Sequence, residues 1–305
     1  MLDHHRAMLA DTVRMDAYAA AIRAVVKPGD VVLDIGTGTG ILAFLACRAG
    51  ARHAYAIDAT HAADVAMLLA RHYGLADRVT VFHEHSTSVE LPERANVLVT
   101  EILGAFALEE RILPTIVDAR RRLLTPDALL IPRRIVLSLV PVEQPALIAK
   151  HVDAWNEPRA GFDFSLLRTF AANTWYVDAI DPASHLATPQ PAVDIDLTTI
   201  DAPDVGGTAT FVATRDGIMH GFAGWFAATL ADGVELSNAI PRATCWDQAF
   251  LPLEQPVAIA KGTAIRVELQ SDGRRAWRWR GAAGATAFDQ TTWLDRPPCG
   301  SRVAR

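Results

Sequence analysis

The stretch Val31-Val32-Leu33-Asp34-Ile35-Gly36-Thr37-Gly38-Thr39-Gly40 decides the fold. Its first five residues are apolar and partly β-branched, apart from one acid, which is typical of a short buried strand. Three glycines spaced by two residues follow, and glycine lets a backbone turn tightly and approach a ligand closely. Residues 41–49 are then mostly apolar and end before Gly50. The stretch therefore predicts a strand, a ligand-binding loop and a helix in succession.

Strand-like and helix-like segments alternate on both sides of this stretch. That order predicts an α/β domain whose parallel sheet is covered by helices on both faces. The expected helices span residues 6–26, 41–49, 62–73 and 108–124, the expected strands span 31–35, 54–57, 79–82 and 97–100, and a turn is expected at 125–127.

The pattern changes after Pro132. Residues 136–140 still favour a strand, and an irregular, aromatic-rich segment follows. From about residue 191 the chain shows short alternating runs punctuated by Gly, Pro and Asp, which is typical of an antiparallel sandwich or barrel. We therefore expect one domain over residues 1–135, an antiparallel β-barrel or sandwich over 136–295, and a frayed tail over 296–305.

Composition excludes several classes of protein. The 305 residues carry a formal net charge of -6, so no basic field attracts nucleic acid, and residues 277–280 (Trp-Arg-Trp-Arg) fit a barrel strand better than a nucleic-acid contact. The three cysteines, Cys47, Cys245 and Cys299, predict neither disulfides nor a metal site, and they suit a reducing compartment. The chain shows no secretory signal and no membrane span, so we expect a cytoplasmic protein without a membrane partner.

The glycine loop indicates a nucleoside ligand of a particular kind. The dinucleotide fingerprint needs a glycine where Ile41 stands, and the Gly-Lys-Ser/Thr end of a phosphate-binding loop is absent. Asp58, at the end of the next strand, can accept hydrogen bonds from both hydroxyls of a ribose. The Asp-x-Gly-x-Gly-x-Gly form beginning at Asp34 resembles the first motif of Rossmann-like class I methyltransferases, which use S-adenosyl-L-methionine. Another nucleotide-binding α/β protein remains the alternative.

A second acidic feature follows the strand at residues 97–100. Glu101 stands at the carboxyl end of that strand, where ligands bind such sheets, and Gly104 lets the loop turn back towards Glu110. Two carboxylates held close together repel each other, and a cation between them removes that penalty. A guanidinium suits the position because its planar donors match carboxylates in pairs.

The chain from residue 4 to about residue 270 resembles the protein arginine N-methyltransferase family. Residues 100–110 resemble the family's two-glutamate loop, in which Glu110 follows Glu101 with the family's nine-residue spacing. Residues 5–14 resemble its His-x-x-Met-Leu-x-Asp-x-x-Arg segment, and residues 124–132 resemble its junction into a β-barrel. Thr244-Cys245-Trp246 stands where the family has Thr-His-Trp, and residues 155–182 resemble its dimerisation arm.

This resemblance implies an activity and a set of site residues. The enzyme is expected to methylate a guanidino nitrogen of arginine, either in a protein or as free arginine or another guanidine compound. An arm over about residues 150–188 implies a homodimer. Catalysis is expected from Glu101 and Glu110, substrate contacts from the same two residues with Cys245 and Trp246, and cofactor contacts from His5, Arg14 (to the methionine carboxylate), Asp34, Gly36, Gly38, Gly40, Asp58, Ser86 and Thr87.

The sequence also departs from the family pattern. Only four residues precede His5, so we expect a bacterial-type member without the Tyr-Phe-x-x-Tyr helix that closes over the cofactor. Asp58, Thr87 and Cys245 replace a glutamate, an acid and a histidine. A class I methyltransferase with a different small-molecule or protein acceptor, for example in natural-product biosynthesis, remains open, as does a catalytically silent relative. The presence of both Glu101 and Glu110 favours arginine methylation.

Overall fold

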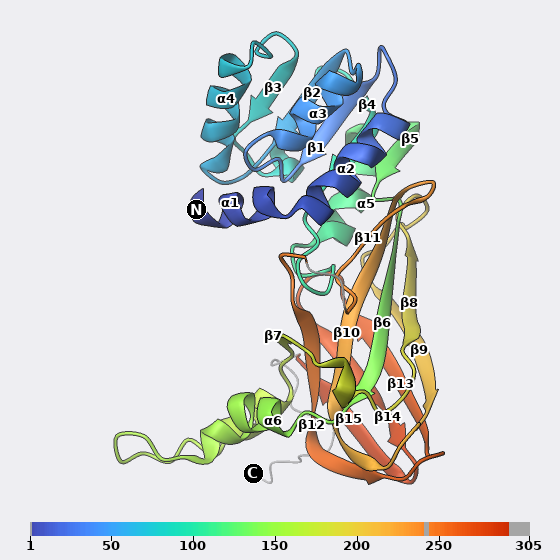
Figure 1. The fold of residues 1–305 in the computed structure, drawn as a ribbon. Coiled ribbons are helices and arrows are strands. Elements are labelled where there is room, and N and C mark those ends of the chain that lie inside the picture. Colours follow the sequence, from blue (N-terminus) through green and yellow to red (C-terminus); the bar gives the residue numbers. More distant parts are fainter. Residues whose placement is uncertain (1, 241–243, 293–305) are drawn as a thin grey trace, which may run out of the picture.

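The computed structural model describes residues 2–240 and 244–292, so the expected tail at 296–305 lies outside the described residues. The first half of the chain forms an α/β unit, and the second half forms antiparallel sheets below it (Figure 1). The last parallel strand ends at Ile131 and the first antiparallel strand begins at Arg134.

The α/β unit contains a five-stranded parallel sheet in the order β3-β2-β1-β4-β5. Its strands are β1 (Val31–Ile35), β2 (His53–Ile57), β3 (Val79–Phe82), β4 (Ala95–Thr100) and β5 (Leu124–Ile131). The accompanying helices are α1 (Leu2–Ala10), α2 (Thr12–Val25), α3 (Ile41–Ala49), α4 (Ala62–His72), α5 (Ile112–Arg122) and the short η1 (Ser86–Ser88). No helix within residues 2–240 and 244–292 has the length and apolar character needed to cross a membrane.

The strand order creates the crevice that holds the site. β1 pairs with β2 on one side and with β4 on the other, and Ile35 stands level with Ile57 and with Thr100. The loops that leave these three strands therefore emerge side by side at the carboxyl edge, where the strand order reverses and ligands of such sheets bind.

The second half contains two antiparallel sheets. One has six strands, in the order β7-β12-β10-β6-β8 with β11 paired to β10, and the other has the order β15-β14-β13-β9. The two sheets share one hydrophobic core. They form a sandwich among the described residues, without closing into a barrel. The strands are β6 (Arg134–Val142), β7 (Tyr176–Asp178), β8 (Gln190–Asp196), β9 (Val205–Val212), β10 (Gly217–Ala231), β11 (Val234–Ser237), β12 (Gln248–Ile259), β13 (Ala264–Ser271), β14 (Trp277–Ala283) and β15 (Thr286–Thr291).

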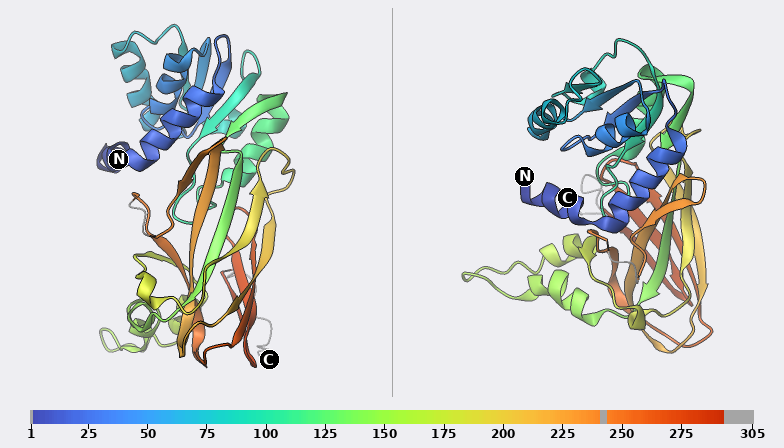
Figure 2. Two further views of the ribbon diagram at one scale, coloured as in Figure 1. Left: turned by 45° about the vertical axis from the view of Figure 1, so that its right-hand side comes forward. Right: turned by 45° about the horizontal axis from the view of Figure 1, so that its top comes forward.

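An arm leaves the sandwich between β6 and β8. It contains α6 (Pro145–His151), η2 (Asp153–Asn156), α7 (Leu167–Ala172) and η3 (Pro182–Ser184). The arm projects away from the sheets on the same side of the molecule as α1, in all three views (Figures 1 and 2).

Three expected elements differ from the structure. The helix expected over 6–26 is two helices, because the carboxylate of Asp11 accepts a hydrogen bond from the Arg14 N–H and begins a new helix there. The helix expected from residue 108 begins at Ile112, because Arg111 has a left-handed backbone with a φ of 65°. The turn expected at 125–127 lies within β5.

Candidate active site

A cleft of about 660 Å³ opens at the carboxyl edge of the parallel sheet. That volume lies in the range of small-molecule sites, roughly 300–1,000 Å³. The cleft collects residues from α1, α2, the loops that follow β1, β2, β3 and β4, and the segment before β12. The expected site residues that line it are His5, Arg14, Gly36, Gly38, Asp58, Ser86, Glu101, Glu110, Cys245 and Trp246, whereas Asp34, Gly40 and Thr87 are not among its lining residues.

The glycine loop depends on the absence of side chains. Gly36, Gly38 and Gly40 have φ values of 74°, 57° and 89°, which favour glycine. A Cβ atom on Gly36 would lie 2.4 Å from Cγ2 of Ile102, and one on Gly38 would lie 3.1 Å from the His5 ring. Glycine at these positions therefore lets α1 and the acidic loop close against the backbone of the cleft floor.

Asp34 stabilises the glycine loop through hydrogen bonds. Its side chain is fully buried and accepts hydrogen bonds from the Thr37 hydroxyl (2.6 Å) and the Ala43 N–H (3.0 Å). Burial raises the pKa of Asp34 to about 7, although both hydrogen bonds act in the opposite direction. Asp34 thus joins the glycine loop to the first turn of α3, while Gly40 stands at the N-terminus of that helix.

Asp58 joins two walls of the cleft. One carboxylate oxygen accepts a hydrogen bond from the Gly38 N–H (2.9 Å), and the other accepts from the Thr60 N–H (2.8 Å) and hydroxyl (2.6 Å). On the neighbouring loop, Glu84 and His85 line the cleft together with Ser86. The exposed Thr87 instead lies with its hydroxyl 2.8 Å from Nδ1 of His85. Glu84 and His85 were not among the expected site residues, because exposed residues beyond a strand carry no distinguishing pattern.

Arg14 pairs with Glu101. The Arg14 Nε–H donates a hydrogen bond to Oε2 of Glu101 over 2.7 Å, Nη2 contacts the same oxygen, and both side chains are largely buried. Arg14 also donates to the Met8 carbonyl (3.0 Å), and its guanidinium carbon lies 5.8 Å from the Trp246 ring centre. Burial acts most strongly and would lower the pKa of Arg14, but Glu101, Tyr18 and Cys245 together outweigh it and the pKa is raised. The residue expected to bind the cofactor therefore also fixes the position of Glu101.

The two other acids of the loop differ in position. Glu110 is exposed on the cleft wall, and desolvation by the surrounding walls, followed by the negative charge of Glu101, raises its pKa to about 7. Glu109 falls within the helix expected over 108–124, but it belongs to the loop before α5 and is half-buried. Its carboxylate accepts a hydrogen bond from the Phe106 N–H (2.7 Å), and burial raises its pKa to about 7. Glu109 therefore stabilises the acidic loop through a hydrogen bond inside it.

The acidic loop is anchored in the sandwich. Phe106 is 1% exposed, and its ring stacks on Trp277 of β14 with centroids 4.9 Å apart. The buried Asn238 side chain donates hydrogen bonds to the carbonyls of Ala105 and Asp247, both over 2.8 Å, and accepts one from the Phe226 N–H over 3.0 Å. These long-range contacts fix the conformation of the acidic loop. The sequence around Asn238 has no local pattern from which they could be predicted.

Two residues hold the N-terminal side of the cleft. The second carboxylate oxygen of Asp11 accepts a hydrogen bond from the Cys245 N–H over 2.7 Å, which places Cys245 and Trp246 on the cleft wall. Burial is the largest of the influences that raise the pKa of Cys245 to about 12, so its thiol stays protonated. The buried Tyr18 hydroxyl donates to the Thr100 carbonyl over 2.9 Å and supports the strand end beside Glu101.

Comparisons with known proteins agree with this geometry. Residues 134–279 match the arginine methyltransferase oligomerization subdomain, and residues 17–133 match the ribosomal protein L11 methyltransferase family. The chain is 30% identical over 276 residues to protein arginine N-methyltransferase 6 of Xenopus tropicalis, covering 86% of this chain and 81% of the relative. It is 32% identical over 276 residues to the arginine N(omega)-methyltransferase of Streptomyces achromogenes subsp. streptozoticus, covering 87% and 75%.

The fold has a solved counterpart as well. The Trypanosoma brucei PRMT1 enzyme–prozyme heterotetrameric complex with AdoHcy superposes with a TM-score of 0.85 at 24% identity, covering 94% of this chain and 96% of that chain. At that coverage, the agreement of fold extends over both halves of the molecule. On the strength of its full-length relatives, the chain belongs to the protein arginine N-methyltransferase family.

Proposed function

We propose that this protein is an S-adenosylmethionine-dependent arginine N-methyltransferase. The observation that carries the proposal is the acidic loop, from which Glu101 and Glu110 both line the cleft that the glycine loop also lines. Desolvation first, and the negative charge of Glu101 second, raises the pKa of Glu110 to about 7, so the charge of each carboxylate disfavours that of the other. A substrate cation removes that repulsion, and a guanidinium offers both carboxylates matching donors.

Residues suited to each part of the cofactor line the cleft. The Asp58 carboxylate can accept hydrogen bonds from ribose hydroxyls, and Arg14, which also pairs with Glu101, is the expected partner of the methionine carboxylate. Gly36 and Gly38 line the same cleft, and Ser86 is expected to contact the adenine. We propose that residues 1–135 hold the cofactor and that residues 136–295 complete the substrate side.

The chain's own residues orient the acceptor and take up its charge. When bound, S-adenosylmethionine supplies a methyl group made electrophilic by the positive sulfur. Glu101, held by Arg14, and Glu110 bind N–H groups of the guanidinium and leave one nitrogen directed into the cleft. A guanidinium is a poor nucleophile because its lone pairs are delocalised, so this orientation lowers the barrier. The pKa of Glu110, about 7, suits a group that accepts the departing proton near neutral pH.

Substitution of Glu101 by Gln tests the proposal. The amide keeps the size of the side chain but removes its charge, so we expect kcat to fall about a hundred-fold or more. The dissociation constant of S-adenosylhomocysteine, measured by calorimetry, should change little. Glu235→Gln on the exposed face of β11 is the matched control. Normal turnover of Glu101→Gln with arginine substrates would contradict the assignment.

Two kinds of acceptor fit the site. One relative that covers the chain is named a protein arginine N-methyltransferase and another an arginine N(omega)-methyltransferase, and a negative cleft suits the guanidinium of either acceptor. Mass spectrometry after incubation with labelled cofactor and either L-arginine or an arginine-rich peptide separates them. Modification of neither acceptor would support the alternative, a class I methyltransferase with a different acceptor.

We propose that the arm builds a homodimer. Large apolar side chains are exposed along it, including Phe162 (69%) and Leu166 (78%), and a second exposed group includes Leu68 and Tyr73 on and beside α4. Apolar surface of this extent favours burial by a second copy. The substitution Phe162→Asp with Leu166→Asp should halve the mass measured by light scattering, whereas Val212→Asp on the exposed side of β9 should not. An unchanged mass for the double variant would contradict the arm contact.

The free thiols support the expected compartment. Cys47 is buried and Cys245 is exposed, and both are unpaired with another cysteine among the described residues. Thiols of this kind persist in reducing surroundings. We propose a cytoplasmic location on this basis, to be tested by fractionation of cells that produce the full chain.

A further inference from the structure

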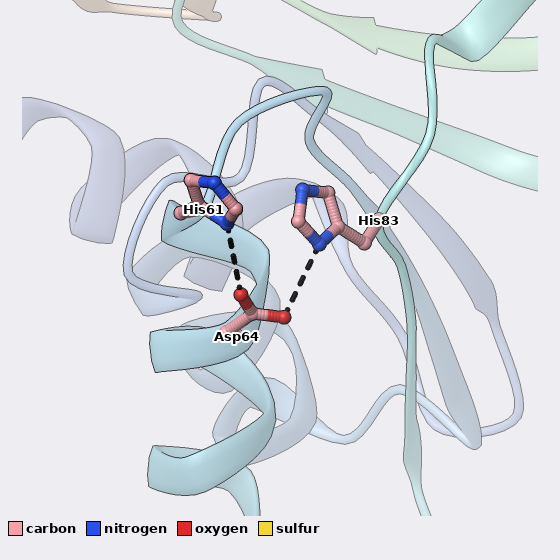
Figure 3. Close-up of side chains that lie close together, drawn as sticks. All are labelled: His61, Asp64 and His83. Atoms are coloured by element: carbon pink, nitrogen blue, oxygen red, sulfur yellow. Dashed lines mark hydrogen bonds and ion pairs between the residues drawn. The ribbon is translucent and has the colours of Figure 1, made fainter.

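Three side chains gather beside the cleft without lining it. His61 immediately precedes α4, Asp64 lies in the first turn of that helix, and His83 follows β3 directly. Both histidine rings point towards the carboxylate of Asp64 (Figure 3). His61 Nδ1 lies 3.3 Å from one carboxylate oxygen, and His83 Nδ1 lies 3.2 Å from the other. All three residues are exposed, and the two histidine rings also meet edge to face with centroids 5.2 Å apart.

The distances match the edges of a metal polyhedron. Imidazole nitrogen and carboxylate oxygen are ordinary zinc ligands, with bonds of roughly 2.0–2.2 Å. Tetrahedral bonds of that length separate neighbouring ligand atoms by about 3.3–3.6 Å. The two nitrogen–oxygen separations are hydrogen bonds to different oxygens of Asp64, and each is close to that spacing. One ligand atom from each residue lies within 4.8 Å of the others, and three protein ligands would leave the fourth tetrahedral position to water.

The cluster also joins two loops of the cleft. His61 follows Thr60, which hydrogen-bonds the Asp58 carboxylate, and His83 precedes Glu84 on the opposite loop. The backbones of these loops meet where the Asp58 N–H donates to the Phe82 carbonyl over 3.1 Å. A ligand that binds both His61 and His83 therefore holds together the loop after β2, which contains Asp58, and the loop after β3.

We propose that His61, Asp64 and His83 bind a divalent transition-metal ion of the zinc class, and that its binding strengthens cofactor binding by joining these loops. The coupling rests on the proposed cofactor cleft, whereas the metal site does not. By thermodynamic linkage, cofactor must strengthen metal binding by the same factor. No metal site was predicted from the sequence. Its cysteines are too few and too far apart to form one, and these two histidines belong to separate segments.

Calorimetric titration of the chelator-treated full chain with zinc chloride tests the site. We expect one ion to bind, with His83→Ala and Asp64→Ala each weakening the affinity about ten-fold or more, because even residues beyond the ligands contribute that much. His72→Ala is the matched control, because it removes an exposed histidine at the other end of α4. Melting curves without zinc establish that each variant is folded. Zinc affinity that is equal in all variants and the parent would overturn the site.

The dissociation constant of S-adenosylhomocysteine tests the coupling. It is measured once with chelator and once with saturating zinc, for the parent, His72→Ala and His83→Ala. We expect about five-fold tighter binding with zinc in the first two proteins, the lower end of ordinary coupling, and no change in His83→Ala. An unchanged constant in the parent would overturn the coupling. Failure of S-adenosylhomocysteine to bind even with chelator would contradict the proposed function instead, and the zinc titration would still decide the metal site.

Discussion

Replacing Asn238 by Ala should uncouple the acidic loop from the sandwich. The Asn238 side chain makes three buried hydrogen bonds, to the Ala105 and Asp247 carbonyls and from the Phe226 N–H. Each backbone group left buried without a partner costs about 1–3 kcal/mol. Water that enters the vacated space recovers part of this cost, so we expect a loss of about 3 kcal/mol in the free energy of unfolding. At roughly 2 °C per kcal/mol, the melting temperature should fall by about 6 °C.

The same change should reduce turnover more than cofactor binding. Ala105 lies between Glu101 and Glu110, so releasing its carbonyl loosens the spacing of the two acids. We expect kcat to fall about ten-fold or more, since small displacements of positioning groups cost that much. Calorimetry with S-adenosylhomocysteine should give a nearly unchanged dissociation constant, because Asn238 lies away from the glycine loop.

Two further variants test whether the hydrogen bonds of Asn238 account for these effects. Asn238→Asp keeps the size of the side chain but turns a carboxylate oxygen towards two carbonyl oxygens, so it should destabilise at least as much as Asn238→Ala. Asn156→Ala, in the exposed part of the arm, should behave like the parent. If Asn238→Asp melts like the parent, the assigned hydrogen bonds are wrong. If Asn238→Ala melts early but turns over normally, the loop does not depend on this anchor.

Two other predictions concern the loops of the cleft. Glu109 has a folded-state pKa of about 7 against an ordinary value of 4.5, so the folded state binds its proton more tightly and stability falls as pH rises from 4.5 to 7. Glu109→Gln should therefore gain up to about 3 kcal/mol relative to the parent at pH 8 and almost nothing at pH 4, by urea unfolding, and an equal gain at both pH values would contradict this. Gly36→Ala should weaken S-adenosylhomocysteine binding about ten-fold or more, because its Cβ meets Ile102 at 2.4 Å in a left-handed backbone. Gly74→Ala, with a φ of 68° and open space, is its control, and equal loss of affinity in both would show that the contact is irrelevant.

The sequence predicted the elements whose signals are local. The strand at Val31–Ile35 and the helix at Ile41–Ala49 were predicted with the bounds that the structure has, because apolar runs and glycines mark both ends. The break at Asp11 was missed, since the alanine-rich sequence around it favours helix on both sides. The residues before Ile112 were predicted as helix because their apolar positions have a spacing that is also typical of the buried face of a helix.

Most residues of the candidate site could be predicted from the sequence, but the contacts between them could not. The resemblance placed Glu101 and Glu110 together, and the structure has both on the cleft wall. It did not reveal that Arg14 pairs with Glu101, because that ion pair joins the first helices to the fourth strand. Contacts such as Phe106 with Trp277 depend on how two sheets meet, which periodicity does not specify.

The burial of Phe106 against β14 has a consequence for how the protein matures. The α/β half is complete at residue 131, and N-terminal units generally fold first during synthesis. The cofactor-binding floor can therefore exist while the sandwich is still being made. Trp277 and Asn238 come much later in the chain, so the acidic loop takes its shape only when nearly the whole polypeptide has folded. We therefore expect methyl transfer to begin only after nearly the whole chain has folded, and a chain that ends before the sandwich to have the glycine loop without an ordered acceptor site.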